Sequence, residues 1–218
     1  MATNNSKTYH LYSYFRSTCT NRVVIAMHIK GIPVEHTYID LSKASHEIPE
    51  FQTLNPSKSV PILIIKEDGN ETILTQSIAI MEYLEESLPT LTPLLPQGDV
   101  VQRARVREMV NIISSDIQPI TNGRIAKRVR AIRGEAMDQI TFVTEVFFRW
   151  PDGFSVGDVV TMADVCFAPA VGMALAYGTN LDGLPRVMAL FEKLGELPAF
   201  QKGHWKMQGD TPEAMRDP

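Results

Sequence analysis

Three segments of different character make up "TYHLYSYFRSTCTNRVVIAMHIKGIPVEHTYID", residues 8–40. The first, residues 8–14, is a short aromatic and apolar run that is typical of a β-strand. Ser17 or Thr18 is then expected to cap a helix that ends at Gly31, because a hydroxyl suits the cap position and glycine suits the stop. The final eight residues alternate as a second strand. A helix between two strands predicts a βαβ unit whose strands are parallel.

On the C-terminal side, the sequence predicts a hairpin followed by a helix. Residues 60–65 and 72–75 are apolar, β-branched runs, and Asp68–Gly69 between them supplies the left-handed geometry of a tight turn. Residues 77–87 carry apolar side chains at helical spacing, and Ser77 is placed to cap this helix. The order β-α-β and then β-β-α therefore fills the N-terminal part of the chain.

A proline-rich segment divides the chain. Residues 89–98 hold three prolines and a glycine, so we expect a linker there, between one domain over 1–88 and a second over 99–218. We find no convincing strand pattern beyond the linker, and the second domain is expected to be all-helical. Two apolar stripes at helical spacing support this: Val106, Met109, Val110, Ile113 and Ile117, and then Met137, Ile140, Thr141, Thr144, Phe147 and Phe148.

Composition narrows the class of protein. With 21 Lys and Arg against 25 Asp and Glu, the 218-residue chain has a net charge of −4, which argues against a nucleic-acid partner. The polar N-terminus lacks a secretory signal, and no apolar run reaches the roughly eighteen residues that span a bilayer. The two cysteines lie far apart, which favours a reducing compartment. We expect a cytoplasmic protein with no membrane partner.

Two polar features are interpreted as structural. Thr161, followed three residues later by Asp164, resembles a capping box that satisfies helix amides, and a catalytic role for Asp164 is the less favoured alternative. The arginine-rich residues 100–110 and the glutamates of the 77–87 helix are interpreted as solvated faces.

No metal site is expected, because the histidines are scattered and none forms a ligand-spaced cluster; they are His10, His28, His36, His46 and His204.

The helix start near residue 17 is the first candidate for chemistry. The first amides of a helix lack internal partners and carry partial positive charge, so a thiolate placed there is stabilised. Ser17 and Cys19 fit such a site, although a plain cap and a small core cysteine are the simpler interpretations. Independently, Pro119 is expected to perturb its own helix, because proline removes one amide.

Two further junctions offer groups for a ligand. Val60 precedes Pro61 at the start of a strand, where a cis bond would turn the backbone of Val60 outward to pair with a peptide-like ligand. The alternative is a proline that merely begins a strand. Gln76 and Ser77 stand at a strand-to-helix junction, where helix amides and a hydroxyl hold a carboxylate or simply form an N-cap. All three junctions are expected to meet at one end of the sheet.

Five motifs, in order, resemble the zeta-class glutathione transferases, the family of maleylacetoacetate isomerase. They are "YSYFRSTCTNRVVIA" (12–26), "LNPSKSVPIL" (54–63), "TQSIAIMEYLEE" (75–86), "IQPITN" (117–122) and "VGDVVTMADVCFAP" (156–169). The resemblance implies the glutathione transferase fold, with an α/β thioredoxin-like N-terminal domain and an all-α C-terminal domain. It also implies a glutathione cofactor, an acidic small-molecule substrate, a homodimer, and isomerisation of a maleyl keto acid in tyrosine and phenylalanine catabolism.

The resemblance also implies residue roles. Ser17 would hydrogen-bond the glutathione sulfur, with Cys19 beside it and Thr18 where the family usually has a second serine. The backbone of Val60 would pair with the cysteinyl unit. The remaining expected contacts are Gln76 and Ser77 at the γ-glutamyl end, His46 at the glycine end, and Gln118 and Asn122 from the second domain.

Two departures from the family pattern keep alternatives open. Asn21 stands where the family usually has an aromatic residue, and Ala176 stands where it has a pocket arginine that holds an acidic substrate. No basic residue follows before Arg186, and Arg16 is one candidate replacement. One alternative is therefore a glutathione transferase that conjugates or dehalogenates electrophiles. Another is a non-catalytic interaction module of the same fold, against which the retained candidate residues argue.

Overall fold

The chain forms two compact units. The structure is a computed structural model that describes residues 7–121 and 154–216. One unit consists of Met1–Thr92 together with Gln201–Pro218, and the other of Pro93–Phe200. The C-terminal residues therefore pack with the N-terminal part of the chain, which the sequence did not predict.

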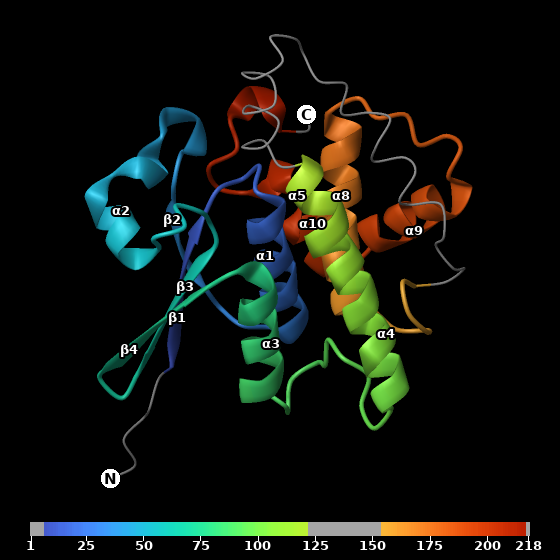
Figure 1. The fold of residues 1–218 in the computed structure, drawn as a ribbon, viewed down its shortest axis with the longest axis horizontal. Coiled ribbons are helices and arrows are strands. Elements are labelled where there is room, and N and C mark those ends of the chain that lie inside the picture. The colour runs from blue at the N-terminus through green and yellow to red at the C-terminus, as the bar shows by residue number, and fades with distance from the viewer. Residues whose placement is uncertain (1–6, 122–153, 217–218) are drawn as a thin grey trace. The chain divides into compact units, whose positions relative to one another are not determined.

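The first unit is built on a mixed four-stranded sheet in the order β2-β1-β3-β4 (Figure 1). Strand β1 pairs in parallel with β2, and β3 is antiparallel to both β1 and β4. This confirms the predicted parallel βαβ unit and the predicted hairpin. The strands are β1 (Thr8–Ser13), β2 (Glu35–Tyr38), β3 (Ile62–Glu67) and β4 (Asn70–Thr75).

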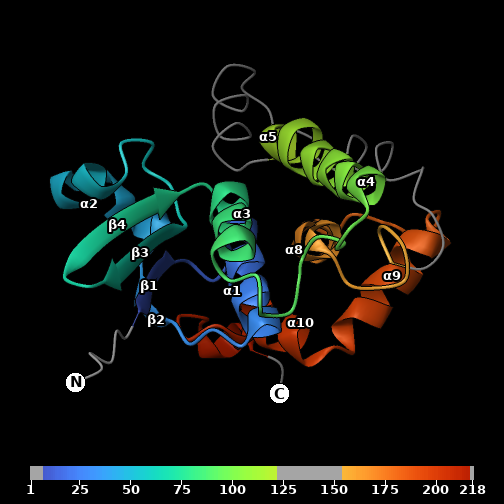
Figure 2. The same cartoon turned by 90° about the horizontal axis from the view of Figure 1, so that it is seen from below.

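Helices cover both faces of this sheet. Helices α1 (Thr18–Lys30) and α3 (Ser77–Ser87) contact each other and lie on one side, as Figure 2 shows. Their apolar residues form one buried cluster with residues of β1 and β3. Helix α2 (Pro49–Leu54) lies on the other side, where its Phe51 packs in a second cluster. The sheet is thus the middle layer of three, as expected for a thioredoxin-like domain.

Local chemistry fixes the ends of these elements. The Ser17 hydroxyl accepts a hydrogen bond from the Thr20 amide (3.2 Å), which confirms Ser17 as the cap of α1. Gly31, with φ of 66°, ends α1 in the left-handed conformation that glycine adopts without a Cβ penalty. Ser77 was wrongly expected to cap α3: the helix begins at Ser77, and Gln76 occupies the cap position without a side-chain bond.

The described part of the second unit, residues 93–121 and 154–200, contains helices and no strand. The first apolar stripe is confirmed as core, with four of its members at most 3% exposed and Met109 partly exposed. The second stripe, residues 137–148, lies outside the described residues. The helices are α4 (Val100–Asn111), α5 (Gln118–Thr121), α8 (Met162–Ala176) and α9 (Pro185–Gly195), with α10 (Pro198–Gly203) at the boundary between the units.

A π-helix, Ile112–Ile117, joins α4 to α5. Its last bond runs from the Gln118 amide to the Ile113 carbonyl, five residues back. Pro119 follows directly and has no amide to continue an α-helical ladder, and its ring crowds the carbonyl four residues earlier. Widening of the preceding turn relieves that conflict. The predicted perturbation by Pro119 therefore takes the form of a π-helix.

Candidate functional site

The turn that leads into α1 exposes a hydroxyl at the helix start. The Ser17 amide donates to the Tyr14 carbonyl (2.9 Å), which closes a turn over residues 14–17. The Ser17 oxygen accepts from the Thr20 amide, so its own O–H proton remains a donor to a ligand. Ser17, Thr18 and Cys19 are all partly exposed. Together with the helix dipole, this arrangement suits a bound anion such as a thiolate.

The second junction is the start of β3. The predicted cis peptide bond between Val60 and Pro61 is confirmed. The Val60 side chain packs in the cluster with Phe51 and Ile62 and is 6% exposed. The side chain of Val60 is thus part of this cluster, and pairing with a peptide would use its backbone.

Asn55 builds the loop that precedes Val60, and sequence reasoning missed it. Its side-chain amide donates to the Ser59 carbonyl (2.8 Å), and its oxygen accepts from the Ser57 amide (3.1 Å) and hydroxyl (2.7 Å). Asn55 is 3% exposed, so it is a core residue of this loop. The signal was present in "NPSKS", because an Asn side chain that bonds the backbone two residues on is a recognised turn former.

The third junction holds backbone strain. Gln76 has φ of 71° and ψ of 116°, a conformation that non-glycine residues rarely adopt, and it lies between β4 and the first turn of α3. Such strain of about 1–3 kcal/mol persists where surrounding structure enforces it, often at binding sites. Gln76 is exposed, whereas Ser77 behind it is 4% exposed.

Strand register brings the three junctions to one edge of the sheet. Tyr12 at the end of β1 is opposite Ile62 at the start of β3, and Ile62 is in turn opposite Thr75 at the end of β4. The residues that follow Tyr12, precede Ile62 and follow Thr75 thus emerge at the same edge, as the sequence predicted. They present a hydroxyl with a helix start, an extended backbone, and a second helix start.

The strand register does not bear on four other residues that the sequence singled out, and their roles stay predictions. His46 lies in the short 3₁₀-helix Ser45–Glu47, with Nε2 3.9 Å from Glu47 Oε1. Gln118 begins α5 in the second unit, and Asn122 lies outside the described residues. Ala176 is the exposed last residue of α8.

Asp164 is confirmed as a structural residue. One carboxylate oxygen accepts from the Thr161 amide (2.8 Å) and hydroxyl (3.0 Å), and the other accepts from the Ser155 amide (2.8 Å). Asp164 is fully buried, and burial raises its pKa against these hydrogen bonds, which lower it. With every oxygen engaged, Asp164 holds the start of α8.

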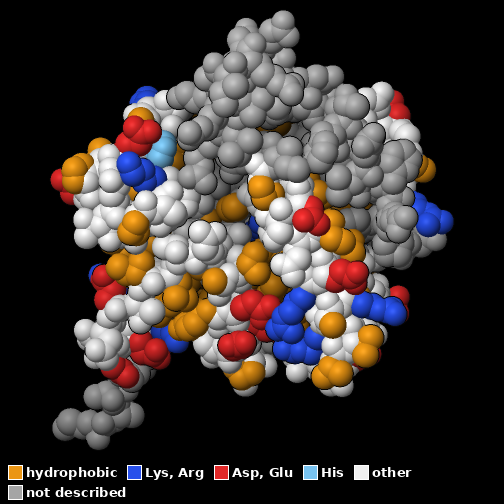
Figure 3. Space-filling view, in the orientation of Figure 1, with side chains coloured by type: hydrophobic (Ala, Val, Ile, Leu, Met, Phe, Trp, Pro, Cys, Tyr) orange, Lys and Arg blue, Asp and Glu red, His pale blue; other side chains and the backbone are white. Residues whose placement is uncertain are grey.

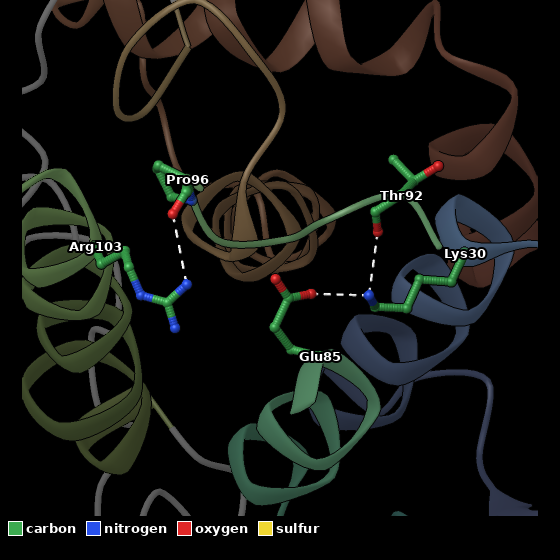
Figure 4. Close-up of polar contacts among 5 residues, drawn as sticks. All are labelled: Lys30, Glu85, Thr92, Pro96 and Arg103. Atoms are coloured by element: carbon green, nitrogen blue, oxygen red, sulfur yellow. Dashed lines mark hydrogen bonds and ion pairs between the residues drawn. The ribbon is translucent and has the colours of Figure 1, made fainter. Parts of the chain in front are cut away.

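The interpretation of the glutamates as a solvated face was wrong for Glu85. Its carboxylate lies 2.8 Å from the Lys30 ammonium, which also donates to the Thr92 carbonyl (3.1 Å), as Figure 4 shows. The two side chains are 5% and 0% exposed. Among the arginines of α4, Arg105 is exposed, as expected of a solvated face, whereas Arg103 and Arg107 are only partly exposed; basic side chains lie at the surface over α4 in Figure 3. In the second unit, Arg103 donates to the Pro96 carbonyl (3.4 Å; Figure 4).

The three junctions of the candidate site offer hydroxyl, thiol and backbone groups for chemistry. Neither Cys19 nor Cys166 is in a disulfide bond. Within residues 7–121 and 154–216 there is no group of three potential metal ligands. No helix in these ranges combines the length and apolar character that crossing a membrane requires.

Comparison with known proteins identifies the class and then the family. Residues 7–86 match the glutathione S-transferase N-terminal domain, which places the chain among the glutathione transferases. Maleylacetoacetate isomerase maiA of Aspergillus fumigatus is 40% identical over 94% of each chain. The chain belongs to the zeta-class, maleylacetoacetate isomerase family.

Two solved structures have the same fold. Maleylacetoacetate isomerase from Anaeromyxobacter dehalogenans, with dicarboxyethyl glutathione and citrate bound in the active site, has a TM-score of 0.82 and 31% identity over 95% of this chain and 99% of that one. A bacterial zeta-class maleyl pyruvate isomerase gives 0.83 and 32% over 93% of this chain and 100% of the other.

Proposed function

We propose that this protein is a glutathione-dependent cis–trans isomerase that converts maleylacetoacetate, or a similar maleyl keto acid, to the fumaryl isomer. One observation carries the proposal: β1, β3 and β4 bring the Ser17 helix start, the Val60 backbone and the Gln76–Ser77 helix start to one edge of the sheet. Relatives of this family that are named for this reaction support it.

The donor set of this edge fits glutathione, a tripeptide with a thiol and two carboxylates. The Ser17 hydroxyl donates a hydrogen bond to the sulfur, and the first amides of α1 lower the thiol pKa. Cys19 lies beside the sulfur. The Val60 backbone pairs with the cysteinyl unit, and Gln76 and Ser77 hold the γ-glutamyl carboxylate at the start of α3. His46, Gln118 and Asn122 complete the proposed contacts.

Glutathione, when bound, supplies a thiolate that adds to the maleyl double bond and leaves after rotation about the resulting single bond. Ser17 and the helix start keep the sulfur anionic before addition and after departure. Dicarboxyethyl glutathione, bound in the related structure, is a thioether of a four-carbon dicarboxylic acid, the class of compound that such an addition forms.

The same family membership supports the wider assignment. We propose a thioredoxin-like domain over residues 1–88, a linker over 89–98 and a helical substrate-pocket domain over 99–218, whose last residues, 201–218, pack with the first unit. The protein would act as a cytoplasmic homodimer on an acidic substrate in tyrosine and phenylalanine catabolism. Citrate, itself a polycarboxylic acid, is bound in the related structure.

The test is isomerase turnover by the purified protein on maleylacetoacetate and maleylpyruvate, with and without glutathione. We expect turnover that requires glutathione and a product that contains no added sulfur. S-methylglutathione, which keeps the tripeptide but blocks the thiol, is the matched control and should inhibit. Turnover without glutathione would contradict the proposal.

A second function is favoured by Ala176. The residue is exposed at the end of α8 and offers no cation for a substrate carboxylate. A glutathione transferase that dehalogenates or conjugates small electrophiles needs no such cation. Rates on a maleyl acid and on an α-halo acid at equal glutathione separate the two functions.

A further inference from the structure

The C-terminal segment, defined here as residues 201–216, is stabilised by hydrogen bonds among its own residues. It contains the 3₁₀-helices Trp205–Met207 and Glu213–Met215, and side chains bridge its turns. These bonds run from Gln208 Nε2 to the carbonyls of Lys202 and His204 (2.9 Å each), from Thr211 Oγ1 to that of Trp205 (2.6 Å) and from Arg216 Nε to that of Thr211 (3.0 Å). The segment therefore presents its outward side chains in a fixed geometry.

This segment packs closely against the N-terminal part of the first unit. A Cβ at Gly203 would collide with Ile25 of α1, and a Cβ at Gly209 would collide with Tyr38 of β2. The Trp205 ring packs against the Phe15 ring, with centroids 6.3 Å apart. The segment thus reaches the turn over residues 14–17 that precedes α1.

One hydrogen bond joins the segment to that turn. The Phe15 amide donates to Asp210 Oδ2 at 2.9 Å. The turn itself is closed by the bond from the Ser17 amide to the Tyr14 carbonyl, which leaves the Phe15 amide without a partner inside the turn. Phe15 is 6% exposed, so an unpaired amide there would carry the cost of a buried polar group.

We propose that Asp210 is a positioning residue for Ser17: by holding the Phe15 amide, it fixes the turn that presents the Ser17 hydroxyl and the start of α1 to the glutathione sulfur. The inference rests on the proposed function. It assigns to the far end of the chain a role in the N-terminal site. Asp210 acts through the backbone and does not touch the substrate.

Electrostatics exclude a role for the Asp210 charge in activating the thiol. A carboxylate near a thiol raises the thiol pKa, which opposes thiolate formation. Burial raises the pKa of Asp210, whereas the hydrogen bond from the Phe15 amide and the charge of His36 lower it, and its second oxygen, Oδ1, is buried without a hydrogen-bond partner. The proposed role of Asp210 therefore depends on Oδ2, which accepts the hydrogen bond from the Phe15 amide. If Asp210 acts only by holding the Phe15 amide, removing its charge while keeping its oxygen leaves the thiol pKa unchanged. If its charge acts on the thiol, the same change lowers the thiol pKa.

The test compares Asp210→Asn, which keeps an acceptor oxygen, with Asp210→Ala, which removes it. In the intact protein we expect Asp210→Ala to lower kcat/KM for glutathione about tenfold, the effect of one lost hydrogen bond of about 1.4 kcal/mol. The pKa of the bound thiol, from thiolate absorbance against pH, should rise in the same variant. Asp210→Asn should stay within about threefold of the wild type in kcat/KM, since its oxygen still accepts from Phe15.

Asp40→Asn is the matched control. Asp40 accepts a hydrogen bond from the Ser42 amide and does not bond the turn, while its charge acts on Tyr14 and Asp210. This variant therefore removes a neighbouring charge and leaves the Phe15–Asp210 hydrogen bond in place. Should Asp210→Ala not fold, Asp210→Glu displaces the same acceptor by one methylene and should also lower kcat/KM. Wild-type kinetics in Asp210→Ala, or equal losses in Asp210→Asn and Asp210→Ala, would overturn the inference. Absence of glutathione-dependent turnover in the wild type would instead overturn the proposed function.

Discussion

Ser17 combines its cap with the chemical role we propose for it, and both depend on a single oxygen. As an acceptor it caps α1 through the Thr20 amide, and as a donor it is free to bind the sulfur. The Ser17→Ala substitution should therefore destabilise the fold by about 1 kcal/mol through the lost cap. It should also lower kcat by about 10–100-fold, because a hydrogen bond to a charged group contributes about 1.5–3 kcal/mol.

Ser17→Thr is the control for both effects, because it keeps the hydroxyl. Its kcat should remain close to that of the wild type, and urea unfolding measures the cap in both variants. If Ser17→Ala loses stability but keeps full turnover and an unchanged pKa of bound thiol, Ser17 is only a cap.

His36 gives the first unit a pH dependence. Its Nδ1 lies 3.2 Å from the Ser13 hydroxyl, and its ring stacks on Tyr38. Burial lowers the pKa of His36 from its ordinary value of 6.5, which Asp210 only partly offsets. The folded state therefore favours the neutral ring. The stability this provides is complete above about pH 6.5 and is lost as the pH falls through the lower, folded-state pKa.

His36→Phe keeps the ring stack and removes the titration. Free energies of unfolding in urea at pH 7 and pH 5 should differ less in this variant than in the wild type. A residual slope is expected from His28, whose pKa burial also lowers. Identical slopes in the two proteins would exclude His36 as a source of acid sensitivity.

At the scale of elements, a buried ion pair joins α1, α3 and the chain that follows them. Removing one partner leaves a buried charge without its counter-charge, so Lys30→Met should destabilise the protein by about 3–5 kcal/mol. The double variant Lys30→Met/Glu85→Leu should recover most of this loss, because apolar side chains replace both charges.

The exposed pair Lys66–Glu71, at 3.5 Å on the hairpin, is the matched control. Lys66→Met should cost less than about 1 kcal/mol, because solvent screens that pair. Equal losses from Lys30→Met and Lys66→Met would show that burial of the Lys30–Glu85 pair is unimportant. Urea midpoints for the four proteins supply the comparison.

Elements whose ends depend on adjacent residues were predictable from the sequence. The Ser17 cap, the Gly31 stop and the Asp68–Gly69 turn each depend on one or two residues, and all three are confirmed. The predicted cap of α3 was wrong. Gln76 occupies the cap position with a strained backbone, and that strain is imposed by its surroundings rather than by its residue type. The Lys30–Glu85 pair was missed for a similar reason, since 55 residues separate its members.

For the whole molecule, the largest feature that the sequence concealed is the return of the C-terminal segment to the first unit. No periodicity marks it, because its contacts depend on two glycines, one aromatic ring and one carboxylate. The three junctions of the candidate site were predictable, since each carries its own local signal. Asp210 was not, because its partner Phe15 lies 195 residues away.

Glycine substitutions test this return directly. A Cβ at Gly203 would meet the side chain and the backbone of Ile25 within α1, so Gly203→Ala forces α1 and the C-terminal segment apart. We expect a loss of about 1–3 kcal/mol in the free energy of unfolding, the usual cost of overpacking. At Gly209 the collision is with the end of the Tyr38 side chain, which can rotate, so Gly209→Ala should cost less.

Gly195→Ala is the control, because Gly195 lies at the end of α9 and a Cβ there meets nothing. This variant should be neutral or more stable by up to about 1 kcal/mol, since alanine loses less backbone entropy than glycine. Urea unfolding should therefore rank the variants with Gly203→Ala the least stable, Gly209→Ala intermediate and Gly195→Ala at or above the wild type. Wild-type stability in Gly203→Ala would mean that the segment does not lie against α1 in solution, because no flexible side chain alone can absorb a contact with the Ile25 backbone.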